Sequence, residues 1–145
     1  MNNKKGFTLI EILLVIVIIA VLAGIVLIAV NPARQVSQAN DAQRRSDVNS
    51  ILNAIHQYAI DNRGALPSSI TTSAQTMGSS VGQANICSNL VPTYIAALPY
   101  DPTASGSGYT DCASYNTGYT VIKDANNRIT VNAASAEVDS ISVTR

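Results

Sequence analysis

The chain of 145 residues contains no tryptophan, one phenylalanine and one histidine. Charged residues make up 12% of it, against a usual share of ~25%. No run of Lys and Arg indicates a nucleic-acid partner. The single histidine, His56, has no Cys-x-x-Cys motif or second histidine nearby to complete a metal site, and we expect it to pack at the edge of a helix. No metal and no cofactor is predicted.

One short string resembles an enzyme motif, but its surroundings argue against catalysis. Gly78-Ser79-Ser80-Val81-Gly82 matches the G-x-S-x-G pattern of serine hydrolases. That chemistry requires a strand, a sharp turn and a helix, with the histidine later in the chain. Here the string lies in a segment rich in Ser and Thr, and His56 precedes it. The chain is therefore predicted not to be an enzyme.

The sequence does contain a long apolar run. From Ile12 to Val30, 19 consecutive residues lack a charge or a hydrogen-bonding side chain, and roughly 20 suffice to span a bilayer as a helix. The run is longer than the roughly 7–15 apolar residues of a secretory signal peptide. A plain single-pass anchor fits its length, with Lys4 and Lys5 in the cytoplasm. Such an anchor leaves Glu11 unexplained, because a carboxylate at the bilayer centre costs at least ~2.5 kcal/mol.

A third interpretation comes from the start of this run. Lys5-Gly6-Phe7-Thr8-Leu9-Ile10-Glu11 resembles the processing site of type IV prepilins and pseudopilins, which carry a class III leader peptide. The resemblance is strongest over residues 4–30 and fair to about residue 67. It implies that a prepilin peptidase cuts between Gly6 and Phe7 on the cytoplasmic side and methylates the new N-terminus at Phe7.

The resemblance also gives Glu11 a role in assembly. After cleavage, Phe7 would carry a cationic amine, and Glu11 would lie one turn along, where the positive end of the helix dipole favours a carboxylate. No cation follows before Arg34. In this family the corresponding glutamate is thought to pair with the amine of a neighbouring subunit. We expect Glu11 to dock on Phe7 of an adjacent copy, with a pair inside its own chain as the alternative in the resting membrane state.

Two positions are expected to break the N-terminal helix. Pro32 has no N–H to donate to Ile28, so Asn31-Pro32 should kink or unwind it, and Gly24 is a second weak point. In filaments of this family the helix is often unwound between such a glycine and proline. Carried to residues 24–32, this implies a segment that lets a filament stretch. The alternative is a kink at the membrane exit.

After Ala33, apolar residues recur at three- and four-residue spacing and predict a one-sided helix that ends at Gly64, before Pro67. Charged residues occupy much of the rest of this helix, and Asp41 and Arg45 are expected to form an i,i+4 pair. The apolar stripe consists of Val48, Ile51, Leu52, Ile55, Ala59 and Ile60.

The remaining residues are expected to form a head that covers this stripe. Residues 68–85 predict a solvated loop, and residues 94–98 one helical turn. Alternating patterns predict three strands at 119–123, 128–132 and 140–144, with a hairpin turn at 124–127. A small antiparallel sheet on the helix is the simplest packing.

Two further sets of residues in the head have possible roles. Cys87 and Cys112 are the only cysteines. If exported they can form a disulfide that closes a loop of about 25 residues, worth ~3 kcal/mol, and the alternative is two free thiols. Asp101, Asp111 and Asp124 could contribute to a calcium site like that of major pseudopilins, but their spacing matches no calcium loop, and no site is predicted.

The expected fold is α+β, with a long N-terminal helix packed on a small antiparallel sheet. The first half of the helix is apolar and of membrane-spanning length, and its second half is amphipathic. The expected divisions are a leader peptide (1–6), a transmembrane and filament-core helix (7–30), an amphipathic helix (31–63) and a globular head (64–145).

The expected function is that of a structural subunit of a type IV pilus. The subunit would wait in the cytoplasmic membrane as a single-pass protein and then polymerise into a surface filament. Its partners would be copies of itself, prepilin peptidase, the inner-membrane assembly machinery and membrane lipid before assembly. The alternative is a pseudopilin of a type II secretion or DNA-uptake (competence) pseudopilus.

Overall fold

A computed structural model describes residues 6–145. Lys4, Lys5 and the rest of the expected leader before Gly6 lie outside the described residues. The chain divides into two compact units, residues 1–36 and 37–145, and each is described by itself. The first unit holds helix α1 (Leu9–Ala29) and the start of α2 (Pro32–Asp61), and the second holds the rest of α2 and the head.

Helix α1 begins and ends at residues suited to those positions. Thr8, in an extended conformation, caps its N-terminus, and the helix continues through Gly24 to Ala29. Val30 is extended, with φ −100° and ψ 100°. Helix α2 then starts at Pro32, a residue whose missing N–H is not needed in the first turn. The interruption therefore lies at residues 30–31, and Gly24 is helical.

Helix α2 presents an apolar face to the head, and it ends where the sequence predicts. Val48, Ile51, Leu52 and Ile55 are fully buried. Ile60 does not belong to this stripe as expected, because it is 77% exposed. At 3.6 residues per turn it lies about 140° around the helix from Ile55. Beyond the helix, Gly64 has a φ of +88° and its N–H donates to the carbonyl of Ala59 at 2.7 Å, a typical C-terminal cap.

The head contains a five-stranded antiparallel sheet with the order β1-β3-β4-β5, in which β2 also pairs with β3. Val121 of β3 faces Val131 of β4, and Val131 faces Val143 of β5. The three predicted strands and the turn after Lys123 are confirmed, although β3 begins five residues earlier than expected. The strands are β1 (Gln75–Gly78), β2 (Gly108–Asp111), β3 (Ser114–Lys123), β4 (Ile129–Ala133) and β5 (Ile141–Thr144).

Two expectations for the first part of the head were wrong. Strand β1 lies within the segment 68–85 that was predicted to be a loop, because backbone pairing with β3 compensates for its weak composition. The short helix α3 (Cys87–Leu90) precedes the helical turn expected at residues 94–98, which are not helical. A disulfide joins Cys87 at the start of α3 to Cys112 in the β2–β3 turn, as predicted.

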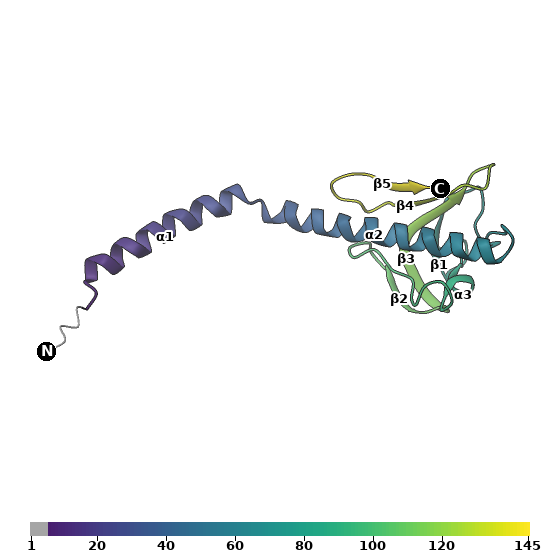
Figure 1. Cartoon of the computed structure of the whole chain (residues 1–145), viewed down its shortest axis with the longest axis horizontal. Helices are drawn as coiled ribbons and strands as arrows, with labels where there is room; N and C mark the ends of the chain where they lie inside the picture. Colours follow the sequence, from purple (N-terminus) through teal and green to yellow (C-terminus); the bar gives the residue numbers. More distant parts are fainter. Residues whose placement is uncertain (1–5) are drawn as a thin grey trace. The chain divides into compact units, whose positions relative to one another are not determined.

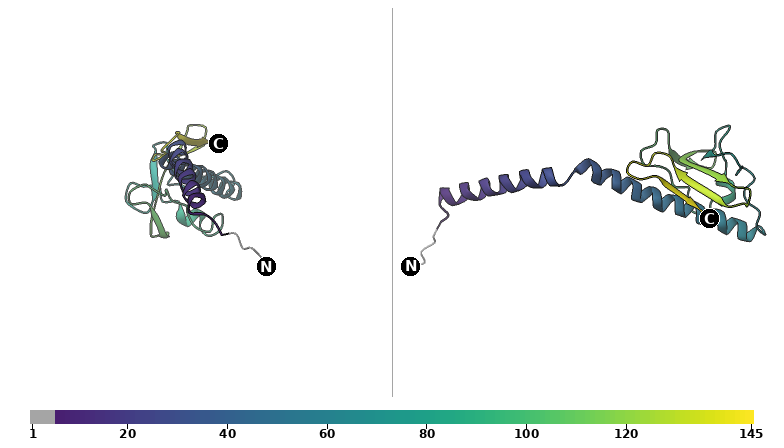
Figure 2. Two further views of the ribbon diagram at one scale, coloured as in Figure 1. Left: turned by 90° about the vertical axis from the view of Figure 1, so that its left-hand side faces the viewer. Right: turned by 90° about the horizontal axis from the view of Figure 1, so that it is seen from above.

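One face of the sheet lies against α2, as Figures 1 and 2 show. Alternate residues of β3 point to this side: Tyr115, Thr117, Tyr119 and Val121 are buried. Tyr115, Tyr119 and Val121 belong to the same hydrophobic core as the buried stripe of α2. The expected α+β fold, with a helix packed on a small antiparallel sheet, is thus confirmed.

Candidate functional site: the N-terminal segment and the buried Arg44 cluster

The expected cleavage site precedes α1. Gly6, Phe7 and Thr8 have no regular secondary structure and are exposed, so the Gly6–Phe7 peptide bond is accessible. A Cβ added at Gly6 would have no heavy atom within 4 Å. The packing of the chain therefore does not require glycine here, and a requirement for it would have to come from a partner that handles this bond.

Glu11 has a local partner that the sequence analysis overlooked. The N–H and the hydroxyl of Thr8 donate to Oε2 of Glu11 at 2.8 and 2.9 Å, and the Glu11 N–H donates to Oγ1 of Thr8 at 3.3 Å. This is a capping box, and the spacing Thr-x-x-Glu before an apolar run is its signature. Both Thr8 donors bind the same carboxylate oxygen, and Oε1 is left to accept from another group.

The surface of α1 is apolar and uncovered by the rest of its unit. Its large apolar side chains, apart from Ile28, are between 49% and 83% exposed. The stretch Leu9–Leu27 is long and apolar enough to cross a membrane. An apolar surface of this extent marks a site of contact with lipid or protein.

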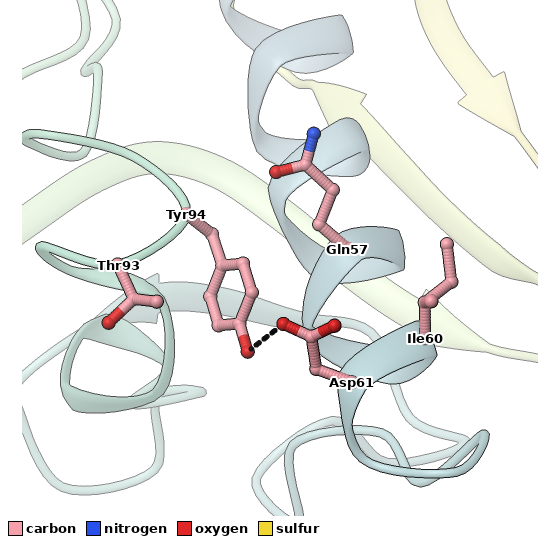
Figure 3. Close-up of a pocket in the computed structure, with 5 residues that line it drawn as sticks. All are labelled: Gln57, Ile60, Asp61, Thr93 and Tyr94. Atoms are coloured by element: carbon pink, nitrogen blue, oxygen red, sulfur yellow. Dashed lines mark hydrogen bonds between the residues drawn. The ribbon is translucent and has the colours of Figure 1, made fainter.

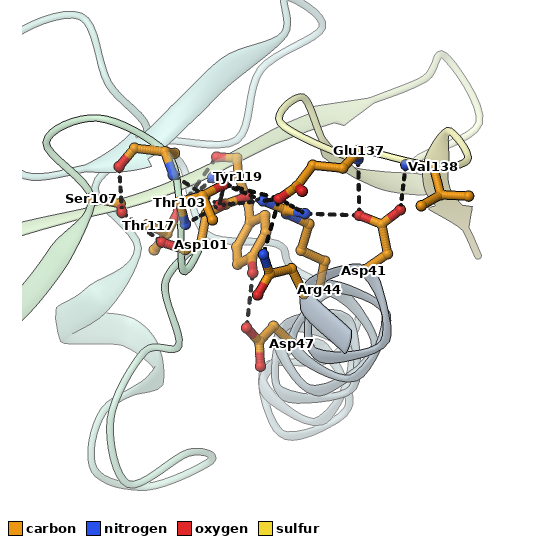
Figure 4. A network of polar contacts seen from close by, with 12 residues as sticks. Asp41, Arg44, Asp47, Asp101, Thr103, Ser107, Thr117, Tyr119, Glu137 and Val138 are labelled. Carbon is orange, nitrogen blue, oxygen red and sulfur yellow. Dashed lines mark hydrogen bonds and ion pairs between the residues drawn. The ribbon is translucent and has the colours of Figure 1, made fainter. Parts of the chain in front are cut away.

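A second polar site lies in the head, where Arg44 of α2 is fully buried among carboxylates (Figure 4). Its guanidinium group donates to Asp101 from Nε at 2.8 Å and from Nη2 at 3.0 Å. Nη1 donates to Asp41 at 2.8 Å and to Glu137 at 3.2 Å. One cation thus links α2 to the loop after α3 and to the loop between β4 and β5.

Backbone N–H groups compensate for the excess of carboxylates in this cluster. Asp41 accepts from the backbone of Glu137, Val138 and Asp139 at 3.0, 2.8 and 3.4 Å. Burial alone would raise the pKa of Asp41, but these bonds and Arg44 outweigh it and hold the pKa well below its usual range. The pKa of Asp101 is likewise raised by burial and lowered by more through Arg44 and two backbone donors.

The neighbouring Asp47 belongs to the same buried row on α2. It accepts a hydrogen bond from the Tyr119 hydroxyl at 2.8 Å and another from the Gln43 amide at 2.7 Å. The pKa of Tyr119 lies well above its usual value, mainly because the hydroxyl is buried and also because it is bound to the carboxylate of Asp47. Tyr119 therefore keeps its proton and ties the middle of β3 to α2.

The expected ion pair between Asp41 and Arg45 was wrong. Asp41 pairs with Arg44 instead, and Arg45 pairs with Asp139 across the surface at 3.2 Å. The sequence did contain the necessary signal. Positions 41, 44, 48, 51 and 55 continue one stripe at three- and four-residue spacing, so the charged residues at its start lie on the buried face.

The three carboxylates considered for calcium each have a different binding partner. Asp101 binds Arg44, Asp111 accepts from the backbone of the β2–β3 turn, and Asp124 pairs with Arg128 at 2.7 Å. Within residues 6–145, no three His, Cys, Asp or Glu side chains are grouped to hold a metal ion. His56 is half-buried on α2.

Comparison with known proteins connects these features. Residues 1–27 match the family described as the prokaryotic N-terminal methylation motif. Over 62 residues the chain is 44% identical to the type IV wide pilus major component PilA4 of Thermus thermophilus. That stretch covers 43% of this chain and 46% of the relative, which is therefore matched over about half its length. No solved structure matches the chain.

The match to the N-terminal methylation motif spans the Gly6–Phe7 bond and most of helix α1, which is long and apolar enough to cross a membrane. Both matches agree with the resemblance to type IV pilins that the sequence around Gly6 and Glu11 indicates.

Proposed function

We propose that this chain is the structural subunit of a type IV pilus, cut after Gly6, methylated at Phe7 and polymerised through α1 into a surface filament. The observation that carries the proposal is the apolar surface of α1. Its side chains are exposed on all sides of the helix and need a lipid or protein environment. Lipid would supply this environment before assembly, and α1 of other copies would supply it in the filament.

Processing sets the chemistry of the N-terminus. Cleavage leaves the Phe7–Thr8 peptide intact, so Thr8 can cap Glu11 before and after the cut. The new ammonium group of Phe7 is a suitable partner for the open Oε1 of Glu11 on a neighbouring copy. A buried pair that loses one member costs ~3–5 kcal/mol, so an ammonium–carboxylate pair in an apolar core would favour one docking position over others. We therefore assign Glu11 to assembly and Gly6 to recognition by prepilin peptidase.

The proposal divides the chain by role into the leader 1–6, the filament-core helix 7–30, the amphipathic helix 31–63 and the head 64–145. Before assembly the subunit would cross the cytoplasmic membrane once, with its head outside, where the Cys87–Cys112 disulfide is stable. Its partners would be other copies, prepilin peptidase and the inner-membrane assembly machinery. The role is structural rather than catalytic.

A surface pilus is favoured over a secretion or DNA-uptake pseudopilus because the relative to which 62 residues of the chain are 44% identical is a wide pilus component. The interruption of the helix at residues 30–31 supports a flexible joint between the filament-core helix and the head. Gly24 is helical in this structure, so the helix would unwind at Gly24 only on assembly.

The proposal is tested by deleting the gene and examining the cells by electron microscopy, together with mass spectrometry of the chain purified from filaments. Loss of filaments and a mature chain that starts at N-methylated Phe7 are expected. If the chain retained Met1, and if deletion of its gene left the filaments of the cells unchanged, a simple membrane anchor would be favoured instead.

A further inference from the structure

Asp61 differs from the other carboxylates of the head. It is the last residue of α2, and its one hydrogen bond comes from the hydroxyl of Tyr94, at 3.0 Å to Oδ2. Within the described residues, neither a cation nor a backbone N–H binds it. Six other carboxylates of the head are bound by a cation or by a backbone N–H. The remaining one, Asp47, is buried, and each of its two oxygens accepts a hydrogen bond. The six are Asp41, Asp101, Asp111, Asp124, Glu137 and Asp139.

The surroundings of Asp61 form an open pocket of about 340 Å³ (Figure 3). It is lined by Gln57, Ile60, Asp61, Thr93 and Tyr94. The ring of Tyr94 is held by an edge-on contact with Tyr58 at 5.9 Å between ring centroids. A carboxylate beside a fixed aromatic ring and an exposed aliphatic side chain suits the guanidinium group and methylene stem of an arginine.

The chain itself provides such a side chain at the other end of the same helix. Arg34 lies in the first turn of α2, is exposed, and forms no ion pair within the described residues. Its position is unfavourable, because the N-terminal end of a helix carries a partial positive charge. Asp61 is equally misplaced at the negative C-terminal end. The first turn of α2 has no acidic residue and the last turn no basic one to offset these charges.

We infer that the Asp61 pocket of one copy receives Arg34 of a second copy. This interface rests on the proposed function, since it requires that copies assemble. Bringing the end of one α2 to the start of another places each misplaced charge beside its opposite and beside the helix end that favours it. Because the two residues occupy opposite ends of one helix, the pair joins different copies and would fix the stagger between subunits.

Charge exchange tests the pairing. Arg34→Asp and Asp61→Arg are made singly and together in the full chain, and filaments sheared from cells are quantified against mature subunit in the membrane. We expect each single change to lower filament yield about tenfold, and the double change to restore it to within about twofold of the parent. Arg45→Asp and Asp139→Arg are matched controls, because they reverse the charges of an exposed ion pair within one copy, and they should leave the yield unchanged.

A milder variant separates folding from assembly. Asp61→Asn removes the charge but keeps an oxygen for the Tyr94 hydroxyl, and it should lower the yield while thermal unfolding in detergent stays at the parent value. Normal yield from both single reversals, or no recovery in the double variant, would overturn the pairing. In either case a loss of filaments in Glu11→Ala would leave the proposed function standing, whereas normal filaments in that variant would contradict the proposed docking role of Glu11.

Discussion

The guanidinium group of Arg44 and the carboxylate of Asp101 form a two-point contact, with Nε 2.8 Å from Oδ2 and Nη2 3.0 Å from Oδ1, and both side chains are buried. Such fork-shaped pairing fixes direction as well as distance. A buried pair is not by itself more stable than apolar packing, but removal of one member leaves an uncompensated charge. The contact therefore fixes how the loop after α3 sits on α2.

Asp101→Ala is expected to destabilise the full chain in detergent micelles by ~3–5 kcal/mol, because Arg44 would stay buried without its main partner. Denaturation followed by near-ultraviolet circular dichroism of the tyrosines measures this change. The matched control is Asp139→Ala, which removes an exposed ion pair with Arg45 and should cost at most ~1 kcal/mol. Equal losses in the two variants would argue against a special role for the buried pair.

The same cluster predicts a dependence on pH. The folded-state pKa values of Asp41 and Asp101 lie below the ordinary value of 3.8. Their stabilising contribution is therefore fully present above about pH 4 and is lost as the pH falls through the folded values. Unfolding midpoints should agree at pH 7 and pH 5 and fall steeply below pH 4.

Asp41→Asn serves as the control for this pH dependence. This variant should be less stable at neutral pH and should lose less on acidification, because one of the shifted groups is gone. A parent protein that gained stability between pH 4 and pH 3 would be inconsistent with carboxylates that are ionised in the folded state.

Gly118 in β3 is required by its surroundings in two ways. Its φ is +73°, and an added Cβ would lie 3.0 Å from Cβ of Asp101 and 3.1 Å from Cβ of Ala104. Gly118→Ala should therefore destabilise the chain by more than the ~1–3 kcal/mol of backbone strain alone. Gly82→Ala isolates that strain, since Gly82 has a φ of +83° and open space around it. If both variants lost the same amount, the close approach of the Asp101 loop would be unimportant.

Glu11→Ala should leave cleavage after Gly6 intact and sharply reduce filaments, since the carboxylate that would meet the amine of a neighbouring copy is removed. Thr8→Val removes one of the two donors to Oε2 and weakens the helix cap by ~1 kcal/mol, so a smaller loss is expected. N-terminal mass spectrometry and quantification of sheared filaments measure both steps. Uncut Glu11→Ala subunits would instead place this residue in processing.

Those parts of the fold that depend on local pattern were predictable from the sequence. Alternation in β3, β4 and β5, and the Gly64 cap of α2, each follow from neighbouring residues, and the structure confirms them apart from the earlier start of β3. Strand β1 was missed because its composition is that of a loop, and only pairing with a strand about 40 residues later makes it extended.

The buried Arg44 cluster was missed for a different reason. Charged residues on an amphipathic helix are normally assigned to solvent, and the partners that make burial of Arg44 possible come from residues 57 and 93 positions away. The spacing of Asp41 and Arg44 along the apolar stripe placed them on the covered face, but the sequence alone does not reveal which loop reaches them. The capping box at Thr8 and Glu11, by contrast, could have been found from its local motif.

The central claim is that α1 leaves lipid to form the core of a filament of identical copies. A high-resolution reconstruction of the purified filament tests it most directly. The α1 helices of neighbouring copies are expected to pack together at the axis, with the amine of Phe7 beside the carboxylate of Glu11 from another copy. A filament in which α1 faces solvent, or in which that carboxylate lies far from every terminal amine, would contradict the account.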